Sequence, residues 1–143
     1  REDELLILEN NASTVVSHEV SPVIDLDSVF KAREFVDQVY MDDKLKGYVV
    51  DVVLATRDPV RYGAAELEAF VRFGASPRAT ISLALAAKAL AFMERRSFVT
   101  PQDIKNIGPD VLRHRVIVSY EAEAENVSSD EVVQRIFETV PVP

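Results

Sequence analysis

Apolar side chains and alanines occupy nearly every position between Pro77 and Arg95. This stretch predicts a helix that is apolar almost all round, which is typical of a helix at the centre of a bundle. Ile81, Leu85 and Phe92 mark one face of this helix, and Leu83, Ala86, Leu90 and Met93 lie beside it. Its many alanines would allow other helices to approach closely on several sides.

Apolar residues at three- and four-residue spacing predict further helices along the chain. Most of them follow a residue whose side chain can accept a hydrogen bond from a free backbone N–H. These expected caps are Asp27, Asp42, Thr100 and Ser128. The expected ranges are residues 2–10, 27–39, 42–57, 66–71 and 128 onward.

Two stretches near residue 110 have a less regular pattern. The helix that begins after Thr100 meets Gly108 and Pro109, and we expect Pro109 to begin a second short helix through Arg113, because proline interrupts helical hydrogen bonding. The β-branched stretch from His114 to Tyr120 alternates loosely and predicts a short extended segment.

These elements predict a mainly α-helical fold, with a short extended segment near residues 114–120. A chain of 143 residues with 48% hydrophobic residues can build one compact core. We expect a single domain, in which residues 1–26 form a lead-in helix and loop and residues 27–143 form a helical bundle. Val15, Val16 and Val20 are the expected packing points of that loop.

Charge and composition exclude several classes of function. The formal net charge is −8, so a basic face for nucleic acid is not expected. There is no cysteine, and His18 and His114 have no metal-binding spacing, so no metal site is predicted. No apolar run is long enough to span a bilayer, so we expect no membrane insertion and a cytoplasmic location.

No complete enzymatic motif is present in the chain. Its four glycines are too scattered to build a phosphate-binding loop, and no pair of carboxylates is singled out as catalytic. The segment does not look like an enzyme by itself.

The candidate chemistry lies where the central helix begins, at Gly74 and Ser76-Pro77-Arg78. Gly74 is expected to let the backbone turn, Ser76 to cap the helix and Pro77 to occupy its first position. Arg78 then lies in the first turn, where the helix dipole disfavours a cation and favours an anion. Either Arg78 binds an anionic ligand there, or it pairs with a nearby Asp or Glu.

Two further cations, Arg113 and Arg115, also have either a binding role or a structural one. They could face a nucleotide or an adjoining subunit. The alternative is that they satisfy the last carbonyls of a helix, as we also expect of Arg95 and Arg96.

Several blocks in fixed order give the chain a resemblance to the C-terminal lid of MoxR-type AAA+ ATPases. The resemblance covers nearly the whole chain, and its most specific part is the Ser-Pro-Arg helix start followed at the right distance by Thr-Pro-x-Asp and Leu-Arg-His-Arg. The blocks are Gly74-Ala75-Ser76-Pro77-Arg78-Ala79, Ala86-Ala87-Lys88-Ala89, Val99-Thr100-Pro101-Gln102-Asp103-Ile104, Pro109-Asp110-Val111-Leu112-Arg113-His114-Arg115 and Tyr120-Glu121-Ala122-Glu123-Ala124-Glu125.

The resemblance implies an AAA+ lid-type bundle in which Arg78 is the sensor 2 residue that contacts the terminal phosphates of ATP. It implies a parent protein that binds ATP and Mg, hydrolyses ATP, assembles as a hexameric ring and remodels partners. Members of the family are often paired with von Willebrand A-domain proteins. The phosphate loop and the other catalytic motifs would lie in an N-terminal ATPase domain outside this chain. We therefore expect no cofactor bound to this segment alone.

Two other functions remain open at the level of sequence. The first is a stand-alone helical protein-interaction module in which Arg78 makes only a salt bridge. The second is a helical transcription-factor domain, against which the acidic charge balance counts.

Overall fold

The computed structural model describes residues 1–12 and 21–143, which form two compact units, Arg1–Phe30 and Lys31–Pro143. The boundary between the units lies within helix α2 (Leu26–Gln38), a few residues after the predicted boundary at residue 26. The expected packing points Val15, Val16 and Val20 lie outside the described residues.

The first unit contains α1 (Glu2–Asn11) and the beginning of α2. No residue of α1 is buried, and its apolar side chains from Leu5 to Leu8 are exposed. The Asp25 carboxylate accepts the Ser28 N–H at 2.6 Å at the start of α2. The prediction that Asp27 caps this helix was therefore wrong by two residues, since Asp27 already lies within it.

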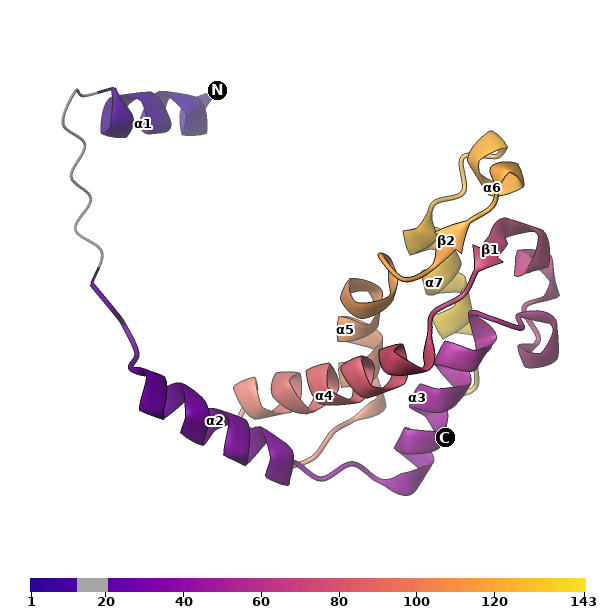
Figure 1. The fold of residues 1–143 in the computed structure, drawn as a ribbon, viewed down its shortest axis with the longest axis horizontal. Helices are drawn as coiled ribbons and strands as arrows, with labels where there is room; N and C mark the ends of the chain where they lie inside the picture. Colours follow the sequence, from indigo (N-terminus) through magenta and orange to yellow (C-terminus); the bar gives the residue numbers. More distant parts are fainter. Residues whose placement is uncertain (13–20) are drawn as a thin grey trace. The chain divides into compact units, whose positions relative to one another are not determined.

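The second unit is a mainly helical bundle with one small antiparallel sheet (Figure 1). Its elements are α3 (Asp43–Ala55), the 3-10 helices η1 (Val60–Tyr62) and η2 (Ala65–Phe70), β1 (Val71–Phe73), α4 (Pro77–Met93), α5 (Pro101–Leu112), β2 (Ile117–Val118), α6 (Tyr120–Ala124) and α7 (Ser129–Thr139). Within the described ranges, no helix is both long and apolar enough to cross a membrane.

Helix α4 packs against both α3 and α5 (Figure 1). Its fully buried face is Ala79, Leu83, Ala87 and Ala91, so small side chains let its neighbours approach closely, as predicted. On the face marked by Ile81, Leu85 and Phe92, the bundle leaves Ile81 63% exposed and Leu85 49% exposed. An apolar pattern on all sides could not reveal which side this chain leaves uncovered.

Helix α5 runs without a break from Pro101 to Leu112 and contains Pro109. The predicted restart at Pro109 was therefore wrong. A proline inside a helix costs about 3 kcal/mol, and packing of α5 against α4 and α7 offsets that cost. At Gly108 any β-carbon would lie 2.1 Å from the Phe137 ring, so this glycine lets α7 approach α5 closely.

The predicted extended segment is confirmed in its middle, where Ile117–Val118 forms β2. It pairs antiparallel with β1, with Val71 opposite Val118 and Phe73 opposite Ile117. Ser119 then donates its hydroxyl to the Ala69 carbonyl at 2.6 Å, which fastens the end of β2 to η2.

The corner between α4 and α5 is held by a bidentate ion pair. Arg96 donates to both carboxylate oxygens of Asp103, at 2.6 and 2.8 Å, and also to Glu94. The side chain of Asp103 is 3% exposed, and it completes a capping box with Thr100. Arg96 therefore binds a buried carboxylate, whereas the sequence suggested that it would satisfy the last carbonyls of its own helix.

This corner predicts an acid-sensitive contribution to stability. Burial by itself raises the pKa of Asp103, but hydrogen bonds from Arg96 and from the Thr100 backbone and hydroxyl outweigh it, so the pKa lies below its ordinary value. A carboxyl with a lowered folded-state pKa stabilises the fold above its unfolded pKa, which is about 3.9, and this stabilisation is lost as pH falls through the folded value.

Asp103→Asn should lower the free energy of unfolding at pH 7 by about 2 kcal/mol, because a charged hydrogen-bond network and a helix cap are weakened. Urea unfolding of both proteins should show this difference unchanged from pH 7 to about pH 5 and shrinking below about pH 4. Asp110→Asn is the control, since its ion pair with Arg113 is exposed, and it should have little effect. Equal effects of the two substitutions would contradict the role of Asp103.

Candidate functional site

A buried hydroxyl joins the end of α3 to the segment that begins α4. Thr56 is fully buried, and its hydroxyl donates to the Val53 carbonyl at 2.6 Å. The same oxygen accepts the Ala75 backbone N–H at 2.9 Å. Because Ala75 is also fully buried, the chain has a fixed position just before the helix start.

Gly74 is needed here for close approach. A β-carbon at this position would lie 2.2 Å from the Thr56 carbonyl oxygen and 2.7 Å from the Arg57 Cγ. Among the glycines, the positive φ belongs to Gly63, so Gly74 is required for close approach and not for a left-handed backbone. Its lack of a side chain lets the loop lie directly against the end of α3.

The Ser76-Pro77-Arg78 start has the predicted order, but its cap is unused. Ser76 occupies the N-cap position and Pro77 the first helical position, yet the Ser76 side chain accepts no hydrogen bond from the helix. The starts of α3, α5, α6 and α7 each have a side-chain cap, from Asp42, Thr100, Ser119 and Ser128. Three of those four caps were predicted, and the start of α4 differs from all of them.

Arg78 is exposed in the first turn of α4, which contains no acidic residue. Across residues 1–12 and 21–143, no carboxylate forms an ion pair with it and no acceptor takes its guanidinium N–H groups. The alternative in which Arg78 pairs with a nearby Asp or Glu is therefore not realised. The arrangement leaves a free cation beside an uncapped helix start, and this combination can bind an anion.

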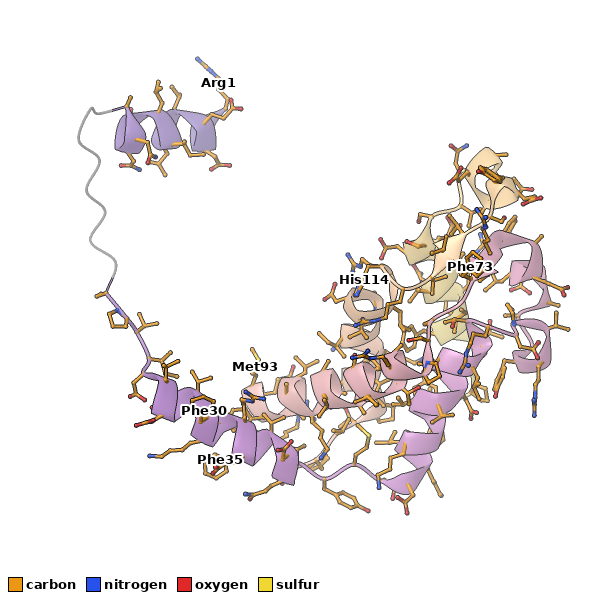
Figure 2. All side chains as sticks on the ribbon, viewed as in Figure 1. Arg1, Phe30, Phe35, Phe73, Met93 and His114 are labelled. Atoms are coloured by element: carbon orange, nitrogen blue, oxygen red, sulfur yellow. The ribbon has the colours of Figure 1, made fainter. Side chains whose placement is uncertain are left out.

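Arg113 and Arg115 follow the end of α5 and have different surroundings. Arg113 donates to the Pro109 carbonyl at 3.1 Å and forms ion pairs with Asp110 at 2.6 Å and Asp130 at 3.1 Å. It therefore satisfies a helix carbonyl, as one of the two interpretations expects. His114 lies between these two arginines in the sequence, and Figure 2 labels it at the turn that follows α5.

Arg115 instead reaches across to α4. Its Nη1 donates to the Val111 carbonyl, and its Nη2 lies 3.4 Å from the Ser82 hydroxyl. The structure thus brings Arg115 to the first two turns of α4, the same part of the helix as Arg78. Arg113 is engaged elsewhere, by carboxylates of α5 and α7.

Sequence reasoning missed two residues of this site, Thr56 and Ser82. Thr56 follows the last residue of α3 and is fully buried, and a hydroxyl among apolar side chains is a signal that a partner is required. Ser82 had no local signal, because its contact with Arg115 joins residues 33 positions apart. No group of three or more His, Asp or Glu suited to a metal ion occurs in the part of the chain that the structure describes.

Comparison with known proteins gives a consistent family. Residues 64–136 match the model of the AAA lid domain. The chain is 36% identical to the chaperone MoxR1 of Mycobacterium tuberculosis over 129 residues, which cover 90% of this chain and 34% of that protein. It is 33% identical to the protein MoxR of Methylorubrum extorquens over 105 residues, which cover 69% of this chain and 30% of that protein.

A solved structure extends the likeness to the fold. A crystal structure from Cytophaga hutchinsonii, assigned as an ATPase, superposes with a TM-score of 0.88 at 34% identity and covers all of this chain and 43% of that one. The chain therefore spans less than half the length of each of these proteins.

Thr56→Val tests whether the buried hydroxyl holds the helix start. The substitution keeps the shape but leaves the buried Ala75 N–H without an acceptor, so we expect a loss of about 1–3 kcal/mol in the free energy of unfolding. The Ala75 amide should also exchange with solvent at least about tenfold faster, as measured by NMR.

Thr80→Val is the matched control for this experiment. Thr80 lies in α4, and no hydrogen bond of its hydroxyl is found in the described part of the chain. Its substitution should leave stability and Ala75 exchange nearly unchanged. Slow Ala75 exchange in Thr56→Val would show that something else holds the loop.

Proposed function

The chain belongs to the AAA lid domain family, in its MoxR-type form, and on that premise we propose that Arg78 is its phosphate-sensing residue. In this proposal Arg78 contacts the terminal phosphates of ATP held by an ATPase domain. The observation that carries it is the exposed Arg78 at an uncapped helix start with no carboxylate partner among the described residues. Ser76 and Pro77 serve to start the helix that presents it.

The chemistry of phosphoryl transfer supports this role. Charge spreads over the phosphate oxygens in the transition state, so a positive group placed in advance lowers the barrier. An arginine suits this task because it stays charged and can donate two parallel hydrogen bonds to a phosphate. A cation on a separate lid also lets the presence of the terminal phosphate alter the position of that lid.

The surface beside Arg78 supports contact with another domain. Ile81 and Leu85 follow Arg78 at three- and seven-residue spacing, so all three lie on the outward face of α4. Ile81 and Leu85 also line an apolar groove of about 310 Å³ between α3 and α4. We assign this face to the ATPase domain of the same polypeptide, which would cover the apolar side chains as it brings ATP to Arg78.

The whole protein, in this proposal, binds ATP and Mg, hydrolyses ATP and assembles as a hexameric ring that remodels partner proteins in the cytoplasm. Arg78 then acts either on the nucleotide of its own subunit or on that of a ring neighbour. Von Willebrand A-domain proteins are the proposed partners, and the acidic charge of the chain supports partners other than nucleic acid. The segment alone is proposed to be inactive, since it carries no phosphate-binding loop.

Arg78→Ala in the full-length protein should lower the ATP turnover number by about a hundredfold or more, the usual effect of removing a group that stabilises transition-state charge. Circular dichroism and the melting temperature should stay unchanged, because the side chain is exposed and has no ion-pair partner among the described residues. Steady-state phosphate release measures the effect.

Lys44→Ala supplies the matched control. Lys44 is also an exposed cation in the first turn of a helix, but its backbone N–H is capped by Asp42 at 2.8 Å. We expect its turnover to remain within about twofold of the unmodified protein. Equal turnover in the two variants would contradict the phosphate role and favour a stand-alone interaction module.

A further inference from the structure

The arginines of this chain divide into those with a carboxylate partner and those without one. Among the described residues, Arg96, Arg113 and Arg135 each form an ion pair with a carboxylate. The other arginines of these residues, Arg78 and Arg115 included, form none. Arg78 and Arg115 are of interest together because Arg78 lies in the first turn of α4 and Arg115 reaches the same helix from the end of α5.

Ser82 places Arg115 beside the helix that carries Arg78. Its hydroxyl is 3.4 Å from Arg115 Nη2, and it follows Arg78 by four residues in α4. Residues at this spacing are neighbours on one side of a helix, with about 5–6 Å between their β-carbons. Two positive side chains from different elements therefore share one flank of the first two turns of α4.

Two hydrogen bonds fix the guanidinium of Arg115 in place without engaging all of its N–H donors. The Val111 carbonyl holds Nη1 and the Ser82 hydroxyl holds Nη2, whereas a guanidinium has five N–H groups to donate. The side chain is only partly buried, so its remaining donors can reach a ligand. A cation held this way needs little reordering when an anion arrives.

We propose that Arg115 is a second phosphate-binding residue, which acts with Arg78 on the same terminal phosphates of ATP. This inference rests on the function proposed above for Arg78. Like charges brought to one side of a helix repel one another, and a phosphate group bound to both would replace that repulsion with two attractive contacts. Ser82 is the positioning residue that keeps Arg115 beside α4.

The test compares Arg115→Ala with Arg113→Ala in the full-length protein. Arg113 is the matched control, because it lies two residues away after the same helix but is paired with Asp110 and Asp130. Equilibrium binding of a fluorescent, non-hydrolysable ATP analogue should weaken about tenfold in Arg115→Ala, the usual loss for a charged hydrogen bond, and less than about twofold in Arg113→Ala. The melting temperature of each variant is measured alongside.

Two additional variants separate binding from a merely structural effect. Arg115→Lys keeps the charge, so it should recover part of the lost affinity, and Ser82→Ala should weaken binding by about twofold to threefold. The difference between the unmodified protein and Arg115→Ala should also shrink as salt is raised from 0.05 to about 0.5 M, since screening weakens the added attraction. A salt-independent difference, or Arg115→Lys no better than Arg115→Ala, would overturn the proposal.

Turnover measurements distinguish failure of this inference from failure of the function on which it rests. If Arg78→Ala loses turnover while Arg115→Ala matches Arg113→Ala in affinity and turnover, the role of Arg115 is wrong and that of Arg78 stands. If Arg78→Ala keeps normal turnover, both proposals are wrong. Loss of affinity in Arg115→Ala at an unchanged melting temperature, together with lost turnover in Arg78→Ala, supports both.

Discussion

The position of the candidate site depends on one buried hydroxyl, that of Thr56. It accepts the Ala75 N–H and donates to Val53, so the last turn of α3 and the loop before α4 share one hydrogen-bonding atom. The missing side chain of Gly74 lets that loop lie against the Thr56 carbonyl. An exposed, flexible arginine can act as a precise ligand only if its backbone has a defined place, and these two residues provide that place for Arg78.

The charges of the molecule are divided between structural and open roles. Asp103 forms an ion pair with Arg96 at the corner between α4 and α5. Arg113 joins α5 to α7 through ion pairs with Asp110 and Asp130. These pairs occupy the guanidinium groups of Arg96 and Arg113, and only the Arg96 pair is with a buried carboxylate. Arg78 and Arg115, like most arginines of the described ranges, form no ion pair, and these two share the first two turns of α4.

The features that sequence predicted well are those that depend on neighbours in the chain. Asp42, Thr100 and Ser128 cap the helices they were expected to cap, because a cap needs only an acceptor and the next few N–H groups. The Ser-Pro-Arg start and the extended segment before α6 are local in the same sense. The candidate site at Arg78 can be recognised from the sequence because a cation in the first turn of a helix opposes the helix dipole. The residues that show this conflict lie within four positions of one another.

The errors fall where distant segments decide the outcome. Packing on α4 and α7 keeps α5 helical through Pro109, and the exposed side of α4 is set by what the bundle leaves uncovered. The contact that requires a glycine at position 74 is with Thr56, which lies 18 positions earlier in the chain, so no neighbouring residue pointed to it. Ser82 and Arg115 meet for the same reason, through a fold that brings the end of α5 back to the start of α4.

The ion pair between Arg96 and Asp103 has a mechanical consequence. It locks the far end of α4 to the beginning of α5, while Arg78 lies at the near end. A helix of 17 residues is about 25 Å long at 1.5 Å per residue. Helices α4 and α5 therefore form a stiff lever, and a small rotation imposed at Arg78 becomes a displacement of several ångströms at the Arg96 corner.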